Sequence, residues 1–141
     1  MVRRLERSDY DAWLPLWQEY LRFYRAELPP ETTASTFERL VGGDLVGLVA
    51  EDGDGALVGF VHLVLHGSTW SVEPYCYLED LFVAPTARGT STAADLFAAA
   101  YAESDRCGAA KTYWQTQEYN GAARSLYDQV GRLTSFVVYE R

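Results

Sequence analysis

The sequence is poor in basic residues, above all in lysine. Lys111 is the one lysine among 12 basic residues, which stand against 20 acidic residues and leave a formal net charge of −8. Binding to nucleic acid requires a basic face that neutralises phosphates, and the basic residues here are few and scattered. The composition therefore excludes nucleic acid as an expected partner and suits a positively charged ligand better.

Cysteine and long apolar runs are scarce as well. Cys76 and Cys107 are far apart and have no zinc-ligand spacing, so neither a disulfide framework nor a structural metal is expected. No apolar run has the length of a membrane span, and residues 1–7 are charged, with no apolar signal-peptide segment after them. We therefore expect a cytoplasmic protein without a membrane segment.

The chain nevertheless has enough apolar surface for one packed core. Of its 141 residues, 48% are hydrophobic and 14% are aromatic, whereas disordered chains lack the apolar area that offsets the ordering entropy. A chain of this length buries roughly two-thirds of its unfolded surface when it folds. We therefore expect residues 1–141 to form a single domain.

Apolar periodicity and turn residues predict the order of the elements. Strands are expected at 2–5, 45–51, 56–65, 76–83, 111–116 and 134–139, and helices at 12–25, 35–41, 92–106 and 120–130. The Asp-Gly repeat at 52–55 predicts a hairpin, and residues 67–73 are expected to form a loop. Hairpins that lead into a strand–helix–strand unit predict a mixed sheet with helices on its faces, in the α/β or α+β class.

Small residues at 83–93 join a buried strand to the helix that follows it. Such a turn aims several backbone N–H groups at one point, where the helix dipole also favours an anion such as a phosphate. The spacing matches neither a Walker P-loop nor a GxGxxG dinucleotide fingerprint. The turn is therefore a candidate anion site, although a strand–turn–helix junction needs small residues for structural reasons too.

Polar residues mark two further elements. Glu79 and Asp80 interrupt a strand that otherwise has the composition of a core strand, and neighbours on a strand point to opposite faces. At least one of these carboxylates is therefore expected in a cleft or against a buried side, with a structural ion pair as the alternative. On the later helix, Asn120 and Tyr127 are two turns apart and share a face. A buried, hydrogen-bonded tyrosine is the alternative there.

Together, these three elements resemble the GNAT N-acetyltransferase family over nearly the whole chain. The family's cofactor turn has the pattern Arg or Gln, two residues, Gly, one residue, then Gly or Ala. In this chain Arg88 and Ala93 agree with the pattern, and Ser91 stands in place of the middle glycine. The strand at 78–83 is similar to that of polyamine and thialysine acetyltransferases. Residues 117–127 and 135–139 are similar to the fungal histone and D-amino-acid acetyltransferases.

The resemblance implies a fold and an activity. The fold is a mixed, mostly antiparallel sheet of six to seven strands with about four helices. The activity is the acetyl-CoA-dependent acetylation of a primary amine, in a polyamine, an amino acid or a lysine side chain, by direct attack. Glu79 would be the base and Tyr127 the acid, while Asp80 would position the cation, or act as the base if the strand register differs by one.

A catalytically weak CoA-binding sensor or interaction module with the same fold is the alternative function. Its motivation is Ser91, which adds a Cβ where the backbone approaches the pyrophosphate. A homodimer is also expected, because related subgroups pair through C-terminal strands and the apolar residues 136–139 would otherwise form an exposed edge.

The resemblance also assigns residues to acetyl-CoA. They are Leu81, Phe82, Val83, Arg88, Gly89, Thr90, Ser91, Thr92, Ala93, Asn120, Ala123 and Tyr127. The amine is expected to contact Glu79 and Asp80, with aromatic residues such as Tyr24 and Trp114 as candidate walls through cation–π contacts; core packing is the alternative for each aromatic residue. His62 and His66 share a strand face but have no third ligand, so no metal site is expected.

Overall fold

A five-stranded sheet forms the centre of the molecule. The computed structural model describes all residues from 1 to 141. The strands lie side by side in chain order: β1 (Val2–Arg4), β2 (Val46–Glu51), β3 (Leu57–Ser68), β4 (Ser71–Val83) and β5 (Lys111–Tyr113). Neighbours from β1 to β4 are antiparallel, and β5 is parallel to β4.

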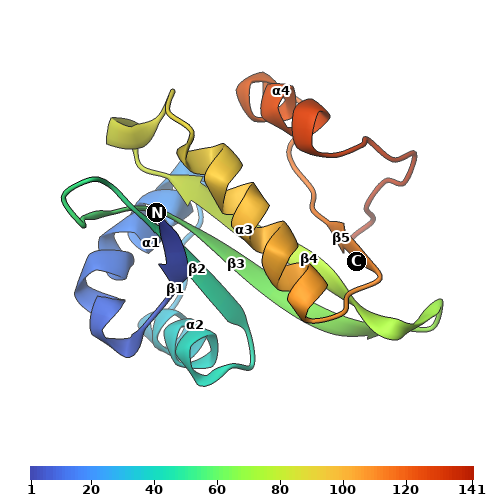
Figure 1. Cartoon of the computed structure of the whole chain (residues 1–141), viewed down its shortest axis with the longest axis horizontal. Coiled ribbons are helices and arrows are strands. Elements are labelled where there is room, and N and C mark those ends of the chain that lie inside the picture. Colours follow the sequence, from blue (N-terminus) through green and yellow to red (C-terminus); the bar gives the residue numbers. More distant parts are fainter.

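Three helices cover the two faces of the sheet, and a fourth lies beyond α3 (Figure 1). The four helices are α1 (Tyr10–Phe23), α2 (Pro30–Gly42), α3 (Thr92–Arg106) and α4 (Gly121–Val130). Helix α3 packs on one face and buries Leu96, Phe97 and Ala100 in one core. Helices α1 and α2 pack on the opposite face, where Trp13 is fully buried. No helix in the chain combines the length and the apolar character that a membrane span requires.

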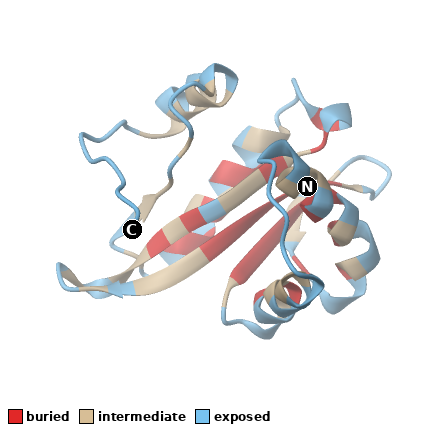
Figure 2. Ribbon diagram, turned by 180° about the vertical axis from the view of Figure 1, so that it is seen from behind, coloured by how far each residue is buried: buried red, intermediate tan, exposed pale blue.

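The middle strand β3 holds the two cores together. Six consecutive residues, from 58 to 63, are buried, because the strand has helices on both of its faces. Val61 and Leu63 belong to the core under α3, whereas Phe60 belongs to the core under α1 and α2. Figure 2 shows buried residues concentrated in these central strands, and α4 contains no buried residue.

Strand β4 contains a bulge at Glu79. Leu78 pairs with Leu63 and Asp80 pairs with His62, which leaves Glu79 without a partner on β3. Such an extra residue shifts the alternation of side chains by one position. Leu78 therefore faces the core under α3, whereas Asp80 contacts His62 on the side of α1.

Strands β4 and β5 separate beyond this short contact. They pair only between residues 75–77 and 111–113, and β4 then continues to Val83 with no partner on the β5 side. Figure 1 shows the chain after β5 turning away from β4 toward α4. The last six residues of β4, 78–83, therefore present free backbone groups on one edge, because a strand without a neighbour leaves its N–H and C=O groups unpaired.

Several predicted elements differ from the structure. Residues 134–139 form no strand, so the sheet has five strands instead of six to seven. A strand needs a hydrogen-bonded neighbour, and this segment has none in the chain. Residues 67–73 are not a loop, because β3 and β4 extend to a tight turn at Thr69 and Trp70. The second helix begins at Pro30 instead of 35, since proline is well tolerated in a first helical turn.

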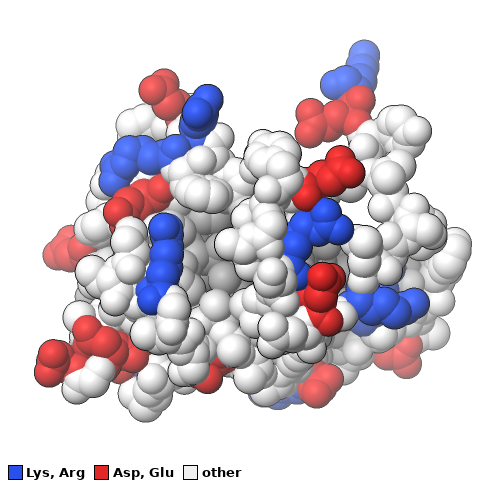
Figure 3. Space-filling view, turned by 90° about the horizontal axis from the view of Figure 1, so that it is seen from above, with Lys and Arg blue, Asp and Glu red and all other residues white.

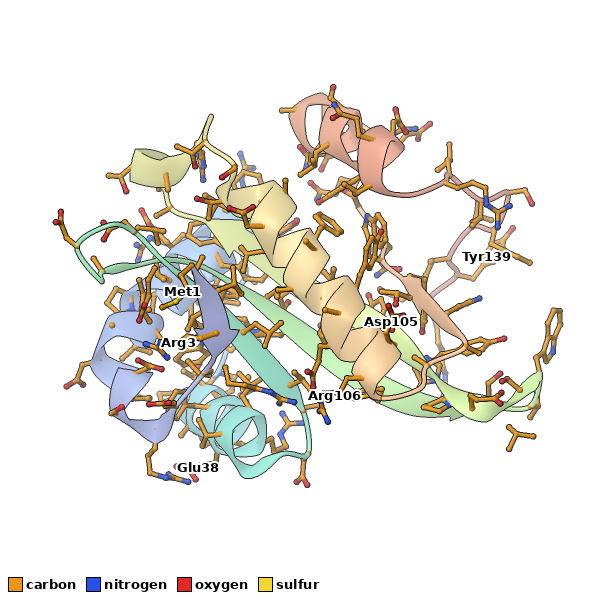
Figure 4. The ribbon with its side chains drawn as sticks, in the orientation of Figure 1. Met1, Arg3, Glu38, Asp105, Arg106 and Tyr139 are labelled. Atoms are coloured by element: carbon orange, nitrogen blue, oxygen red, sulfur yellow. The ribbon has the colours of Figure 1, made fainter.

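The C-terminal tail is the least covered part of the chain. After α4, the apolar residues Leu133 and Phe136 are 75% and 80% exposed, and Tyr139 is 91% exposed. Figure 4 shows Tyr139 on this tail, on the β5 side of the molecule and away from α1. The tail therefore contributes no packing to either core.

Candidate active site

The turn before α3 has the backbone of an anion site. Gly89 has a φ of +78°, which residues with a Cβ rarely adopt. The backbone N–H groups of Gly89, Thr90, Ser91, Ala93 and Ala94 have no hydrogen-bond partner within the protein. These five donors lie at the start of a 15-residue helix, where the helix dipole favours negative charge. The predicted strand–turn–helix junction is therefore present, and its free N–H groups are compatible with the predicted anion site.

The side chains of this turn stabilise its shape. The Thr90 hydroxyl donates to the Ala87 carbonyl oxygen over 2.5 Å, and the Ser91 hydroxyl donates to the Asp95 carboxylate over 2.8 Å. Ser91 has φ −74° and ψ −4°, a conformation that serine adopts without strain. The replacement of the family's middle glycine by serine therefore costs no backbone strain here.

Arg88 connects this turn to the end of β4. Its Nε donates to the Val83 carbonyl oxygen over 3.2 Å, and its guanidinium carbon lies 5.8 Å from the centre of the Phe82 ring.

A neighbouring cavity of about 340 Å³ also touches the turn, but its wall includes Glu51 and Asp52, which disfavour an anion there. Figure 3 shows acidic and basic side chains interspersed on the upper face, which is hollowed near its centre.

Four tyrosines surround the paired carboxylates of β4. Tyr20 lies on α1, Tyr24 directly follows this helix, Tyr77 lies on β4 and Tyr113 lies on β5. Burial is the main cause that raises the pKa of each tyrosine, and the charge of Glu79 or Asp80 raises it further. For Tyr77 the pKa rises to about 12. The two acidic groups therefore lie in an aromatic, partly desolvated site that favours a cation.

The two carboxylates have different environments. Glu79 sits on the bulge and is exposed as a residue, yet protein atoms desolvate its carboxyl group enough to raise its pKa. The charge of Asp80 raises this pKa further, and Arg39 opposes the shift. Asp80 is anchored, because its Oδ2 lies 2.9 Å from Nδ1 of His62. Glu79 is therefore the carboxylate that remains free to take up a proton.

Tyr127 faces this site from α4. Burial is the main cause that raises its pKa, the nearby Tyr24 adds to the rise, and the Thr116 hydroxyl counteracts it. The ring is held edge-on by Phe97 and Trp114, with ring centres 5.6 and 5.7 Å away. Tyr24, which directly follows α1, and Tyr127 on α4 therefore influence each other, although 103 positions separate them in the chain.

Other predicted site residues occupy supporting positions. Trp114 packs on Phe97 with ring centres 4.9 Å apart, and a Cβ on Gly131 would come within 2.5 Å of its ring. Trp114 therefore fills the space between α3 and the end of α4. Asn120 precedes the first turn of α4, where its side chain makes no hydrogen bond within the protein, and Ala123 is half-buried on the same helix.

Some members of the site are not predictable from their own sequence positions. Tyr20 was only one of several aromatic residues on the first predicted helix, and its place beside Asp80 follows from how α1 packs on the sheet. His62 had no predicted role, because its pairing with Asp80 depends on the bulge in β4. The spacing of Tyr20 and Tyr24, one helical turn apart, is the sequence signal that indicates a shared face.

The same motifs and architecture occur in known proteins. The sequence profile of the acetyltransferase (GNAT) family matches residues 12–131. The chain belongs to the GNAT acetyltransferase family. It is 35% identical to the D-amino-acid N-acetyltransferase HPA3 of Saccharomyces cerevisiae, over 100% of this chain and 89% of the relative.

A second relative and the solved structures agree with this assignment. The uncharacterized N-acetyltransferase YhfO of Bacillus subtilis is 35% identical over 98% of this chain and 94% of the relative. A probable acetyltransferase of known structure superposes with a TM-score of 0.88 at 25% identity, over 100% of this chain and 96% of that chain. The aminoglycoside N-acetyltransferase AAC(6')-Iy superposes over the same shares with a TM-score of 0.86 at 20% identity. The GNAT chain is thus an N-acetyltransferase enzyme with the predicted fold class.

Proposed function

We propose that this GNAT enzyme transfers an acetyl group from acetyl-CoA to a small primary amine by direct attack. The observation that carries the proposal is the position of the carboxylate pair. Glu79 and Asp80 lie where β4 leaves β5, and the same strand leads within a few residues to the free N–H groups before α3. One strand therefore links an amine-binding site to an anion-binding turn.

Acetyl-CoA fits the donor side of this site. A related GNAT enzyme has been solved in complex with CoA. The free N–H groups of Gly89, Thr90, Ser91 and Ala93 would bind the pyrophosphate, with Arg88 and Thr92 beside them. The unpaired edge of β4 at Leu81, Phe82 and Val83 would hold the pantetheine arm, and Asn120, Ala123 and Tyr127 would line its far side. Acetyl-CoA supplies the thioester whose acetyl group is transferred.

Glu79 would prepare the amine for attack. An aliphatic amine has a pKa of about 10 and reaches the site protonated, so it must lose a proton before its nitrogen can act as a nucleophile. The raised pKa of Glu79 makes this carboxylate a stronger base than an ordinary glutamate. Asp80 and the Tyr24 ring would hold the ammonium group beside it.

Two further groups would stabilise the oxyanion and protonate the departing thiolate. A backbone N–H near Leu81 would donate to the oxyanion that forms when the amine attacks. The departing thiolate has a conjugate acid with a pKa of about 8.5, and the Tyr127 hydroxyl would return a proton to it. The pair of Glu79 as base and Tyr127 as acid therefore accounts for both proton transfers.

The site also bears on the acceptor class. The acidic pair favours amines that carry positive charge, while the relationship to a D-amino-acid N-acetyltransferase favours amino acids. Arg39 is the cation whose charge reaches Glu79, and it is the group we expect to receive a substrate carboxylate. Amino acids are therefore first in the order of acceptors, followed by polyamines and lysine side chains.

A homodimer is part of the proposal. The exposed apolar residues of the tail, Leu133 and 136–139, would be covered if a second copy paired with this segment. Sedimentation of the full chain and of a chain ending at residue 131 measures this association. A full chain that stays monomeric at high concentration would contradict it.

The function is tested by the release of CoA thiol with a panel of amines. The panel contains D- and L-amino acids, polyamines and a lysine peptide, and mass spectrometry checks for one acetylated amine per CoA. In parallel, saturation at a hundred times the dissociation constant of acetyl-CoA should stabilise the fold by about 2.7 kcal/mol. Stabilisation without turnover on any amine would favour the CoA-binding sensor, and no stabilisation would contradict both functions.

A further inference from the structure

His62 bridges a buried tryptophan and an active-site carboxylate. Its ring is 3% exposed and lies on β3, directly opposite Asp80 on β4. The indole Nε1 of Trp13 donates to Nε2 of His62 over 3.2 Å, and Nδ1 of His62 lies 2.9 Å from Oδ2 of Asp80. Three side chains from α1, β3 and β4 thus form one hydrogen-bonded chain that ends in the site.

Chemistry fixes which group donates in each of these hydrogen bonds. An indole N–H can only donate, so Nε2 of His62 must accept and carries no proton. The proton of the imidazole is then on Nδ1, where it donates to Asp80. A second proton on Nε2 would face the indole N–H of Trp13 and would break that bond. Trp13 therefore selects the neutral tautomer of His62 that donates to Asp80.

The aromatic core prevents these rings from turning. His62 stacks on Phe60 with ring centres 4.4 Å apart and an angle of 12° between the planes. Trp13 is fully buried and stacks on Trp17 at 5.6 Å. Rotation of either ring would require the packed core under α1 to open, so the geometry of the chain is held by packing.

Asp80 forms no ion pair with an arginine or lysine, in contrast to the buried acids Asp9 and Glu103. Asp9 is bonded to Arg3, and Glu103 is bonded to Arg4 and Arg106. The groups near Asp80 are the neutral imidazole of His62, the phenols of Tyr20, Tyr24 and Tyr77, and the second carboxylate, Glu79. Its carboxylate is therefore oriented by the His62 imidazole and is not paired with an arginine or lysine.

We propose that Trp13 and His62 are positioning residues that hold Asp80 as an uncompensated anion for the ammonium group of the acceptor amine. This inference rests on the proposed function, because it assigns Asp80 to the amine. Trp13 and His62 lie behind Asp80 and do not contact the amine. The proposal therefore predicts that amine binding depends on the indole N–H of Trp13 although this group does not touch the amine.

Two matched tryptophan-to-phenylalanine substitutions test this proposal. Trp13→Phe removes the N–H that bonds His62 and keeps an aromatic ring in the core. Trp17→Phe is the matched control, because its Nε1 donates to Thr33 over 3.1 Å and not to His62. We expect Trp13→Phe to raise the KM for the amine about tenfold with little change in kcat, and Trp17→Phe to leave this KM within about twofold. Equal effects of the two variants would overturn the proposal, since both would then act through packing.

Nuclear magnetic resonance of the ¹⁵N-labelled imidazole gives a readout that does not depend on activity. We expect His62 to be the Nδ1–H tautomer in the native protein and in Trp17→Phe, and a mixture of tautomers in Trp13→Phe. An Nε2–H tautomer in the native protein would overturn the proposal. His62→Gln, which keeps a donor for Asp80, should retain more of the amine affinity than His62→Leu; equal losses in both would also contradict it. If no amine is acetylated, the proposed function fails, while the tautomer still decides whether Trp13 orients His62.

Discussion

The two sides of the site are built from different kinds of groups. On the donor side, the turn before α3 offers five unpartnered backbone N–H groups, and its hydroxyls are occupied within the turn. On the proposed acceptor side, the groups assigned to the amine are the side chains of Glu79 and Asp80, which have tyrosines around them. A backbone N–H group is kept when the side chain of its residue is substituted, whereas a carboxylate is lost. The donor side should therefore tolerate changes of sequence that the acceptor side does not.

This difference explains why one departure from the family pattern leaves the turn intact. Ser91 replaces a glycine, yet the backbone of the turn keeps its shape because Gly89 supplies the one positive φ. The acceptor side cannot compensate in this way, because Glu79 and Asp80 are the only carboxylates on the free part of β4. Substitutions on the two sides should therefore differ in the size of their effects and in whether they change catalysis or acetyl-CoA binding.

The largest effect is expected for Glu79→Gln. The amide cannot accept the proton of the amine, so kcat/KM should fall about 100- to 10,000-fold, the usual contribution of a positioned base. The variant should bind acetyl-CoA like the native enzyme. Steady-state kinetics with saturating acetyl-CoA measure the fall, and Glu73→Gln, on an exposed part of the same strand, is the control that should keep full activity.

The pH dependence provides a second measure of Glu79. A base must be deprotonated, and the pKa of Glu79 is raised, so kcat/KM should fall with decreasing pH at a midpoint above the ordinary glutamate value of about 4.3. Glu79→Gln should lose this acid limb. An acid limb that persists unchanged in the variant would assign the base to Asp80 or to another group.

A smaller loss is expected for Tyr127→Phe. The ring keeps its contacts with Phe97 and Trp114, while the hydroxyl that would protonate the departing thiolate is lost. We expect kcat to fall about 100-fold, at the lower end for a positioned acid, with little change in acetyl-CoA affinity. Tyr139→Phe, on the exposed tail, is the control. A Tyr127→Phe variant with native kcat would remove Tyr127 from the mechanism.

The smallest effect is expected on the donor side, for Ser91→Gly. Removal of the Cβ lets the backbone approach the pyrophosphate more closely, so acetyl-CoA should bind more tightly, by less than about tenfold. Ser91→Ala keeps the Cβ and removes the hydroxyl that bonds Asp95, which separates the two contributions. Calorimetric titration measures both variants, and weaker binding by Ser91→Gly would show that the hydroxyl is itself a ligand.

The parts of the fold that depend on local signals were predictable from the sequence. The helix at 92–106 has the predicted bounds, because its apolar spacing and the glycine after it are contained in one short segment. The anion turn was predictable for the same reason, since small residues between a strand and a helix leave few conformations. Local composition therefore accounts for the backbone of the proposed donor side.

The acceptor side depends on pairing between distant segments. The bulge at Glu79 arises from the register of β4 against β3, and this register decides that Asp80 meets His62. The expectation that adjacent strand residues alternate does not include such a bulge. The expected strand at 134–139 failed for a related reason, because β propensity alone does not supply a neighbouring strand.

The acetyl-CoA dissociation constant of Glu79→Gln, measured beside its kcat/KM, tests the division between the two sides most directly. We predict a dissociation constant within about twofold of the native value, together with a loss of kcat/KM of at least about 100-fold. A variant whose affinity for acetyl-CoA falls in proportion to kcat/KM would contradict the division, because Glu79 would then belong to the donor side.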